Sequence, residues 1–180
     1  MKNLSINDLV KVSVVAAIYA ALTLAIAPFA YGPIQFRFAE ILNLLAFFNP
    51  IYILAVTLGV FISNIFSPLG IYDMVFGTLH TLIALIFVWR SRSILTASIW
   101  PAVFSFIIAL ELNLAVNAPF LETWLFVGLS EILICTIIAI PVIHLIWRTG
   151  FIKRHIQDNT SKKWRNNPIW PGLLLRSQTL

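Results

Sequence analysis

Long apolar runs constrain this chain more than any other feature, because they follow one another closely from residue 9 to residue 147. Hydrophobic residues make up 60% of the 180 residues, charged residues make up 11%, and the mean hydropathy is +0.93. This balance excludes an ordinary soluble domain. A chain of this length has room for about six membrane spans of about 20 residues each. We therefore expect an all-α membrane protein, with a bundle of six transmembrane helices over residues 1–157.

Proline, glycine, asparagine and charged residues divide the apolar runs into spans. We expect spans over residues 9–30, 72–89, 94–116 and 122–147. The segment from Ile34 to Phe66 is interrupted by Asn49-Pro50 and is short for two spans of about 20 residues each. It forms either two short helices or a re-entrant hairpin, and both return the chain to the face it left. We interpret the first run as a retained span rather than a cleaved signal.

Lysine and arginine residues predict the orientation in the membrane. The inner segments would hold Lys2, Lys11, Arg90, Arg92 and a basic tail over residues 158–180. The outer segments would hold only Arg37, which is the positive-inside distribution. This distribution predicts a multi-pass protein of the plasma membrane with both termini cytoplasmic. It also explains the net charge of +5 better than nucleic-acid binding, because the basic residues lie at span ends. We expect the basic tail to be poorly ordered.

Three connections on the predicted outer face carry polar groups near the membrane boundary, at residues 31–37, 67–73 and 112–122. An ionised group within lipid costs several kcal/mol unless it is paired or lines a cavity. The candidate ligand-binding residues are Arg37, Glu40, Asn64, Asp73, Glu111, Asn113, Asn117 and Glu131. We expect them to gather in a polar pocket on the outer side.

Structural roles compete with binding at several of these positions. Arg37 and Glu40 are neighbours on one helical face, so they form a structural ion pair or point into the pocket. Asp73 can cap the helix that it opens. The asparagines can join helices or bind a heterocycle. Glu111 and Glu131 lie two or three turns inside their spans, deeper than capping requires, which favours a role in the pocket.

The sequence contains no motif for ATP hydrolysis or for a hydrolase: GxxxxGK[ST], HExxH and GxSxG are all absent. His80 and His144 have no second metal ligand at a useful spacing, and the single cysteine, Cys135, excludes a disulfide framework within the chain. We therefore expect no metal, no cofactor and no enzymatic activity.

Small residues recur at helical spacing in the first span. Ala16 with Ala20, and Ala17 with Ala21 and Ala25, form small-xxx-small patterns. Such strips let helix backbones approach closely in lipid. They predict a docking face, either inside the bundle or for another protein.

Two long segments closely resemble the QueT family, whose members are the substrate-binding (S) components of energy-coupling factor (ECF) transporters for queuosine precursors. They are YGPIQFRFAEILNLLAFF and LGVFISNIFSPLGIYDMVFGTLHT, and Glu111 and Glu131 complete the resemblance over residues 4–147. It implies a six-helix S component with its ligand pocket toward the outer face. It also implies a transmembrane scaffold subunit and two ATPase subunits as partners, with the alanine strip docking on the scaffold.

The implied ligand suits the candidate residues. A 7-deazaguanine base presents a ring N–H beside an exocyclic amine, which a carboxylate can accept in two parallel hydrogen bonds, and a carbonyl to which Arg or Asn can donate. The resulting hypothesis is a subunit that binds such a base and translocates it. The alternative is a stand-alone secondary carrier or small channel that uses the buried carboxylates. A third hypothesis, an intramembrane enzyme, has no metal triad or nucleophile to support it.

Overall fold

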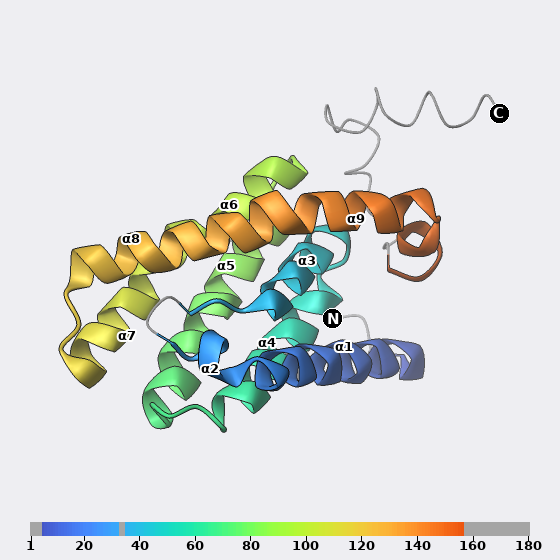
Figure 1. The fold of residues 1–180 in the computed structure, drawn as a ribbon. Helices are drawn as coiled ribbons and strands as arrows, with labels where there is room; N and C mark the ends of the chain where they lie inside the picture. Colours follow the sequence, from blue (N-terminus) through green and yellow to red (C-terminus); the bar gives the residue numbers. More distant parts are fainter. Residues whose placement is uncertain (1–4, 33–34, 157–180) are drawn as a thin grey trace.

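The computed structural model describes residues 5–32 and 35–156, and every regular element in these ranges is helical (Figure 1). In chain order the elements are α1 (Ile6–Ala25), α2 (Ala27–Ala30), η1 (Phe38–Leu44), α3 (Leu45–Phe48), α4 (Ile51–Asn64), η2 (Asp73–Gly77), α5 (Thr78–Arg90), α6 (Ile94–Phe104), α7 (Phe106–Val116), α8 (Phe120–Glu131), η3 (Ile132–Ile138), α9 (Ala139–Arg148) and η4 (Ile152–Ile156). η1 is a 3₁₀ helix, whereas η2, η3 and η4 are π-helical. The predicted tail over residues 158–180 lies outside the described residues.

Four continuous helices in the described part of the chain are long and apolar enough to cross a membrane. They are Ile6–Ala25, Asp73–Arg90, Ile94–Val116 and Phe120–Arg148. They match the expected spans at 9–30, 72–89, 94–116 and 122–147 closely. The all-helical, multi-pass membrane architecture is confirmed. The expected count of six spans is not confirmed, because the lengths and compositions of the described helices support four membrane-spanning helices.

The segment between the first two long helices consists of two short apolar helices, Phe38–Phe48 and Ile51–Asn64. The 14 residues of α4 extend about 21 Å at 1.5 Å per residue, less than the roughly 30 Å of a bilayer core. The chain breaks between them because Pro50 has no N–H, while the Asn49 side chain accepts a 3.0 Å hydrogen bond from the Ile51 N–H. Both arrangements that the sequence allowed, two short spans and a re-entrant hairpin, contain such a pair of short helices.

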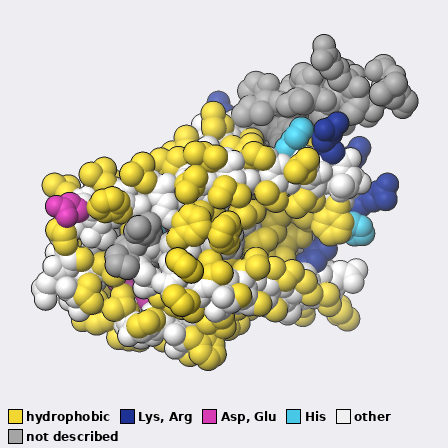
Figure 2. Space-filling model, in the orientation of Figure 1, with side chains coloured by type: hydrophobic (Ala, Val, Ile, Leu, Met, Phe, Trp, Pro, Cys, Tyr) yellow, Lys and Arg dark blue, Asp and Glu magenta, His cyan; other side chains and the backbone are white. Residues whose placement is uncertain are grey.

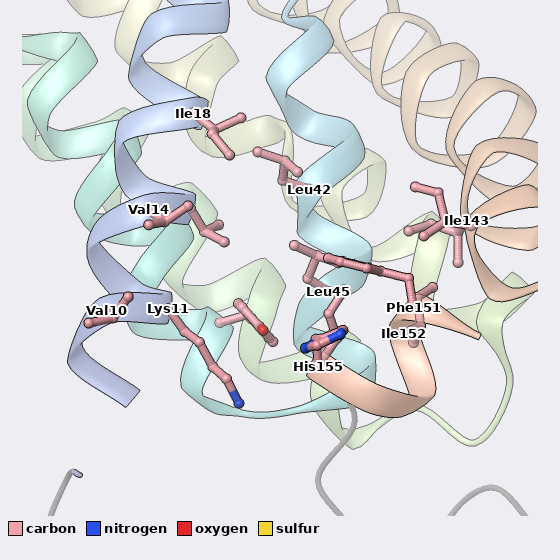
Figure 3. Close-up of a pocket in the computed structure, with 14 residues that line it drawn as sticks. Val10, Lys11, Val14, Ile18, Leu42, Leu45, Ile143, Phe151, Ile152 and His155 are labelled. Atoms are coloured by element: carbon pink, nitrogen blue, oxygen red, sulfur yellow. The ribbon is translucent and has the colours of Figure 1, made fainter. Parts of the chain in front are cut away.

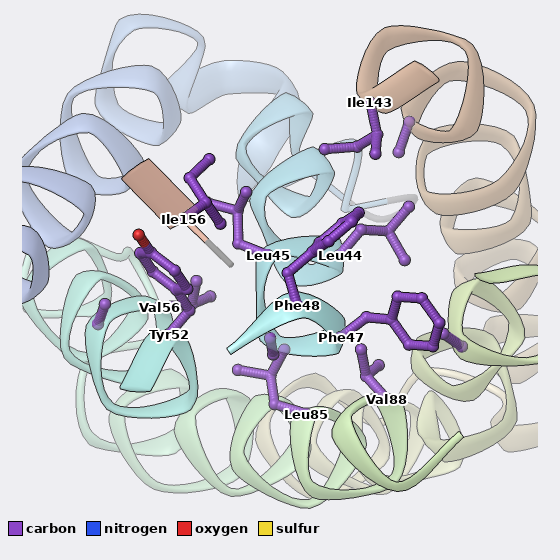
Figure 4. Packing of buried hydrophobic residues seen from close by; sticks show 14 of the residues in the cluster. Leu44, Leu45, Phe47, Phe48, Tyr52, Val56, Leu85, Val88, Ile143 and Ile156 are labelled. Carbon is purple, nitrogen blue, oxygen red and sulfur yellow. The ribbon is translucent and has the colours of Figure 1, made fainter. Parts of the chain in front are cut away.

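The short helix α3 lies in the centre of the bundle. All four residues of α3 are buried, and Phe47 and Phe48 pack among side chains from several helices (Figure 4). These include Leu85 of α5 and Ile143 of α9. The apolar core therefore surrounds α3, whereas α4 contributes one buried face and exposes large apolar side chains such as Leu54 and Phe61 on the other.

The alanine patterns of α1 divide between two faces of that helix. Ala16 and Ala20 are buried, and α1 packs along α4. The approach is closest at Gly59, where an added Cβ would lie 2.7 Å from the Cβ of Tyr19 and 2.9 Å from the Ala16 carbonyl oxygen. The other pattern, Ala17, Ala21 and Ala25, is exposed on the outside of the bundle. The Ala16 pattern thus packs inside the bundle, and the Ala17 pattern remains available for contact with another protein.

The two ends of the bundle differ in charge. Lysine and arginine side chains gather where α1 begins and α9 ends, at the right of Figures 1 and 2. The connections from α2 to η1, from α4 to η2 and from α7 to α8 lie at the opposite end (Figure 1). Polar residues that are far apart in the sequence therefore meet at that opposite end.

The close α1–α4 packing predicts the effect of a single methyl group. Gly59→Ala should lower the free energy of unfolding by about 1–3 kcal/mol, because the new Cβ overlaps Tyr19 and the α1 backbone. Gly128→Ala is the matched control, since its nearest neighbour would be the Ser105 Oγ at 3.3 Å and both variants gain the same helix propensity. Thermal unfolding in detergent micelles measures both. Equal stabilities of the two variants would contradict the packing argument.

Candidate ligand-binding site

Irregular helical segments position the polar residues of the candidate site. Glu40 lies on the 3₁₀ helix η1, Asp73 begins the π-helical η2, and Glu131 directly precedes the π-helical η3. π-helical turns inside longer helices are frequent at functional sites, because they redirect side chains that a regular helix would point elsewhere. Glu40, Asp73 and Glu131 thus lie at or beside places where the backbone departs from α-helical geometry, whereas Asn64 and Glu111 lie on α-helices.

Arg37 is the centre of this site. Its side chain is buried, with 4% exposure, and its Nη2 lies 3.5 Å from the Oδ1 of Asp73, which is also buried. Its Nε donates to the Ala30 carbonyl at 3.2 Å, and its guanidinium lies over the Tyr31 ring, 5.4 Å from the ring centre. The Tyr31 hydroxyl in turn donates to the Ser63 carbonyl. One guanidinium therefore joins the connection from α2 to η1 with the connection from α4 to η2.

Asp73 is held from α4 as well as from η2. The Asn64 side chain donates to the Asp73 carbonyl at 2.7 Å, and the Ser67 hydroxyl donates to the Asp73 carboxylate. Gly77 makes this arrangement possible, because a Cβ there would lie 2.6 Å from the Asn64 Nδ2 and 3.9 Å from an Arg37 nitrogen. A larger residue at position 77 would displace Asn64 from its place beside the ion pair.

Glu111 approaches the same centre from α7. Its side chain is completely buried, and its carboxyl interacts with Asp73 and Arg37. Within residues 5–32 and 35–156, neither of its carboxyl oxygens accepts a hydrogen bond from an N–H or a hydroxyl group, and it can hydrogen-bond with the Asp73 carboxyl only when one of the two groups is protonated. A buried carboxyl in this state is expensive to maintain unless something else uses it.

Glu40 and Glu131 form the neighbouring part of the site. The Tyr19 hydroxyl donates to Glu40 at 2.7 Å, and the Asn43 side chain donates to the other Glu40 oxygen. Cys135 donates to the Glu131 carboxylate at 3.4 Å and to the Glu40 carbonyl at 3.5 Å. Arg37 interacts with both carboxylates, so this group and the Arg37–Asp73 pair belong to one network.

Glu40, Glu131 and Cys135 also place three possible metal-ligand atoms within 4.8 Å of one another. Carboxylates with a thiolate can hold an ion such as Zn²⁺. Hydrogen bonds from the thiol already account for the positions of these groups, so the arrangement does not require an ion.

Polar atoms without partners accumulate around Arg37. In the described part of the chain, the buried atoms that lack a hydrogen bond include Arg37 Nη2, Asn43 Oδ1, Asn64 Oδ1, Asp73 Oδ1 and both carboxyl oxygens of Glu111. One guanidinium also faces four carboxyl groups, those of Glu40, Asp73, Glu111 and Glu131. Buried polar groups are nearly always hydrogen-bonded to protein, water or ligand. The network thus offers donors and acceptors that a polar ligand could fill.

The structure brings together Arg37, Glu40, Asn64, Asp73, Glu111 and Glu131. It places the other two candidates at the end of α7. Asn113 donates to the Ala118 carbonyl at 2.8 Å, and Asn117 is exposed in the left-handed conformation that ends the helix. These contacts give both asparagines a structural role, and their part in binding stays a prediction.

Sequence reasoning did not select several residues of the network, among them Cys135, Tyr19 and His80. Cys135 had a usable signal, because it lies four residues after Glu131 and so on the same helical face. Tyr19 follows the Ala16 position on the tightly packed face of α1, but nothing in the sequence pairs its hydroxyl with Glu40. His80 is buried near Glu40, and its ring Nε2 lies 3.0 Å from the Pro101 carbonyl, where α6 contains a proline.

The family comparison fits this site. A family model described as QueT transporter matches residues 9–148, which contain every residue of the network. The chain belongs to the QueT transporter family. A curated relative from Lactococcus lactis subsp. cremoris (strain MG1363), named queuosine precursor transporter QueT, is 37% identical over 148 aligned residues. The alignment covers 73% of this chain and 87% of the relative. No solved structure matches the chain.

Membership of the QueT transporter family confirms the resemblance read from the two long segments and supports a transporter in the membrane. It also agrees with the expectation that the chain is not an enzyme. The matched region ends at residue 148, before η4 and the tail.

Removal of the central cation should destabilise the fold. Arg37→Met should lower the free energy of unfolding by about 3–5 kcal/mol, because it leaves buried carboxyl groups without their cation. Arg37→Lys should lower the free energy of unfolding by less, since lysine keeps the charge but lacks the planar guanidinium. Arg90→Met, at the exposed end of α5, is the control. Denaturation in detergent measures all three, and an Arg37→Met protein as stable as the control would contradict the central role of this pair.

Proposed function

We propose that this protein is the substrate-binding membrane subunit of an ECF-type transporter and that it imports a queuosine precursor, a 7-deazaguanine base. The observation that carries the proposal is the set of unsatisfied buried polar atoms around Arg37 in a member of the QueT transporter family. The name of the Lactococcus relative supports a queuosine precursor as the transported molecule.

The unsatisfied atoms match the edge of such a base. The Glu111 carboxylate can accept from a ring N–H and the adjacent exocyclic amine, and Arg37 Nη2, which is 3.5 Å from its ion-pair partner Asp73, can donate to the ring carbonyl. The free Oδ1 of Asn64 offers one more acceptor. Glu131 and Glu40 supply negative charge for an amine substituent, because the network contains more carboxyl groups than cations. Asn113 and Asn117 would lie at the entrance rather than in contact with the ring.

The membrane arrangement in this proposal has six crossing segments, with Phe38–Phe48 and Ile51–Asn64 as the short second and third. Both termini are cytoplasmic, and the Arg37 network faces the outside. The gathering of lysine and arginine at the end of the bundle where α9 terminates supports this orientation (Figure 2).

Energy for import comes from partner subunits in this proposal, because the sequence contains no ATP-hydrolysis motif. A transmembrane scaffold and two ATPase subunits supply it. The exposed pattern of Ala17, Ala21 and Ala25 is the proposed docking face, since Ala16 and Ala20 are already used against α4.

A stand-alone secondary carrier is the competing function, and the buried carboxyl groups favour it as proton or cation sites. The two functions differ in their source of energy. Import that survives loss of the ATPase subunits and follows the membrane potential would select the secondary carrier.

Binding should depend on Glu111. Glu111→Gln should weaken binding of a labelled 7-deazaguanine base about tenfold or more, because the neutral amide cannot accept the paired N–H groups as a carboxylate does. The fold should persist, since glutamine has the size of the glutamate side chain and its amide can donate a hydrogen bond to the neighbouring Asp73 carboxylate. Glu122→Gln, on the exposed first turn of α8, is the control. Equilibrium binding to the purified chain tests this, and equal affinities in all three proteins would contradict the proposed pocket.

Docking should depend on the outward alanine face. Ala21→Trp should abolish co-purification with the scaffold subunit and reduce uptake, while ligand binding to the isolated chain stays unchanged. Leu22→Trp adds bulk at a neighbouring exposed position outside the alanine pattern and should retain the assembly. The docking proposal fails if Ala21→Trp leaves the complex intact.

A further inference from the structure

A hollow lies at the end of the bundle opposite the Arg37 network. It is a groove of about 430 Å³ between α1 on one side and α9 with η4 on the other, with η1 and α3 as its floor (Figure 3). Val14 and Ile18 form one wall, Phe151 and Ile152 form the other, and Leu45 lies between them. The lining is almost entirely apolar.

The groove is open toward the surroundings of the bundle. Val10, Val14 and Ile18 are about half exposed, at 55%, 51% and 45%, and Phe151 is 51% exposed. Its deeper surface is buried, as Leu45, Ile143 and Ile152 show. An elongated apolar molecule could therefore enter sideways from the membrane and reach the buried floor.

One end of the groove carries basic side chains. Among the described residues that line it, Lys11, His155 and Tyr52 are the polar or charged ones, and Lys11 and His155 lie at the same end (Figure 3). Lys153 and Arg154 are exposed on η4 beside His155. The nearest acidic group on α1, Asp8, is engaged by Ser5 in the cap of that helix. The charge at this end suits an anion.

We propose that an anionic phospholipid binds in this groove, with one acyl chain along the apolar floor and its phosphate at Lys11 and His155. The shape and the charge select the same occupant: the apolar length accepts a hydrocarbon chain, and the cations lie only at one end. The site is separate from the Arg37 network, because none of its lining residues belongs to that network. The bound lipid would contact α1 on one side and α9 with η4 on the other.

Photoactivatable phospholipids test this with the full chain in lipid nanodiscs. Phosphatidylglycerol and phosphatidylcholine, each carrying a diazirine on the acyl chain, are cross-linked, and the labelled residues are mapped by mass spectrometry. Phosphatidylglycerol should label the groove residues more strongly than phosphatidylcholine, by about fivefold for the charge of Lys11. The variant Lys11→Ala with His155→Ala should remove this preference, whereas Arg90→Ala should keep it.

A second pair of variants tests the apolar part. Val14→Trp fills the groove from its exposed wall and should abolish labelling of the floor by both lipids. Val103→Trp adds the same bulk on the exposed face of α6 and should leave the labelling unchanged. Labelling spread evenly over the outside of the bundle, or unaffected by Val14→Trp, would overturn the proposal. So would zero-length cross-links that place residues 157–180 of the same chain, or another protein, in the groove.

Discussion

The burial of one guanidinium is the constraint on which the end of the bundle around Arg37 depends. An arginine removed from water must be paired, and the partners of Arg37 come from separate parts of the chain: the Ala30 carbonyl, the Tyr31 ring and the Asp73 carboxylate. These contacts fix α2, η1 and η2 relative to one another. Glu111 adds α7 to the same centre. The pairing is incomplete, however, and the remaining free atoms make the centre suitable for a ligand rather than only for support.

Much of the architecture follows from the sequence, because the signals there are local and strong. Hydropathy located the four long helices within a few residues, and Asn49-Pro50 marked the break between the two short ones. The convergence of Arg37, Asp73 and Glu111 followed from a topological argument alone: buried charges on connections at one face must find one another.

Other features depend on tertiary contacts that no local pattern encodes. The 3₁₀ geometry of η1 and the π-helical turns at Asp73 and after Glu131 set the directions of the polar side chains, yet these segments read as ordinary helix. The alanine patterns of α1 look equivalent in sequence, but α4 covers only one of them. η1 shows the same limit, since Glu40 and Asn43 serve the polar network while Leu42 lines the apolar groove.

The central claim is that the buried network around Arg37 is the place where the transported molecule binds. The most direct measurement is a cryo-electron microscopy structure of the chain with a bound 7-deazaguanine base, at a resolution that orients the ring. The account predicts the ring within hydrogen-bonding distance of Arg37 and Glu111, with Asn64 beside it. A base bound elsewhere, with the Arg37 network closed and out of its reach, would contradict it.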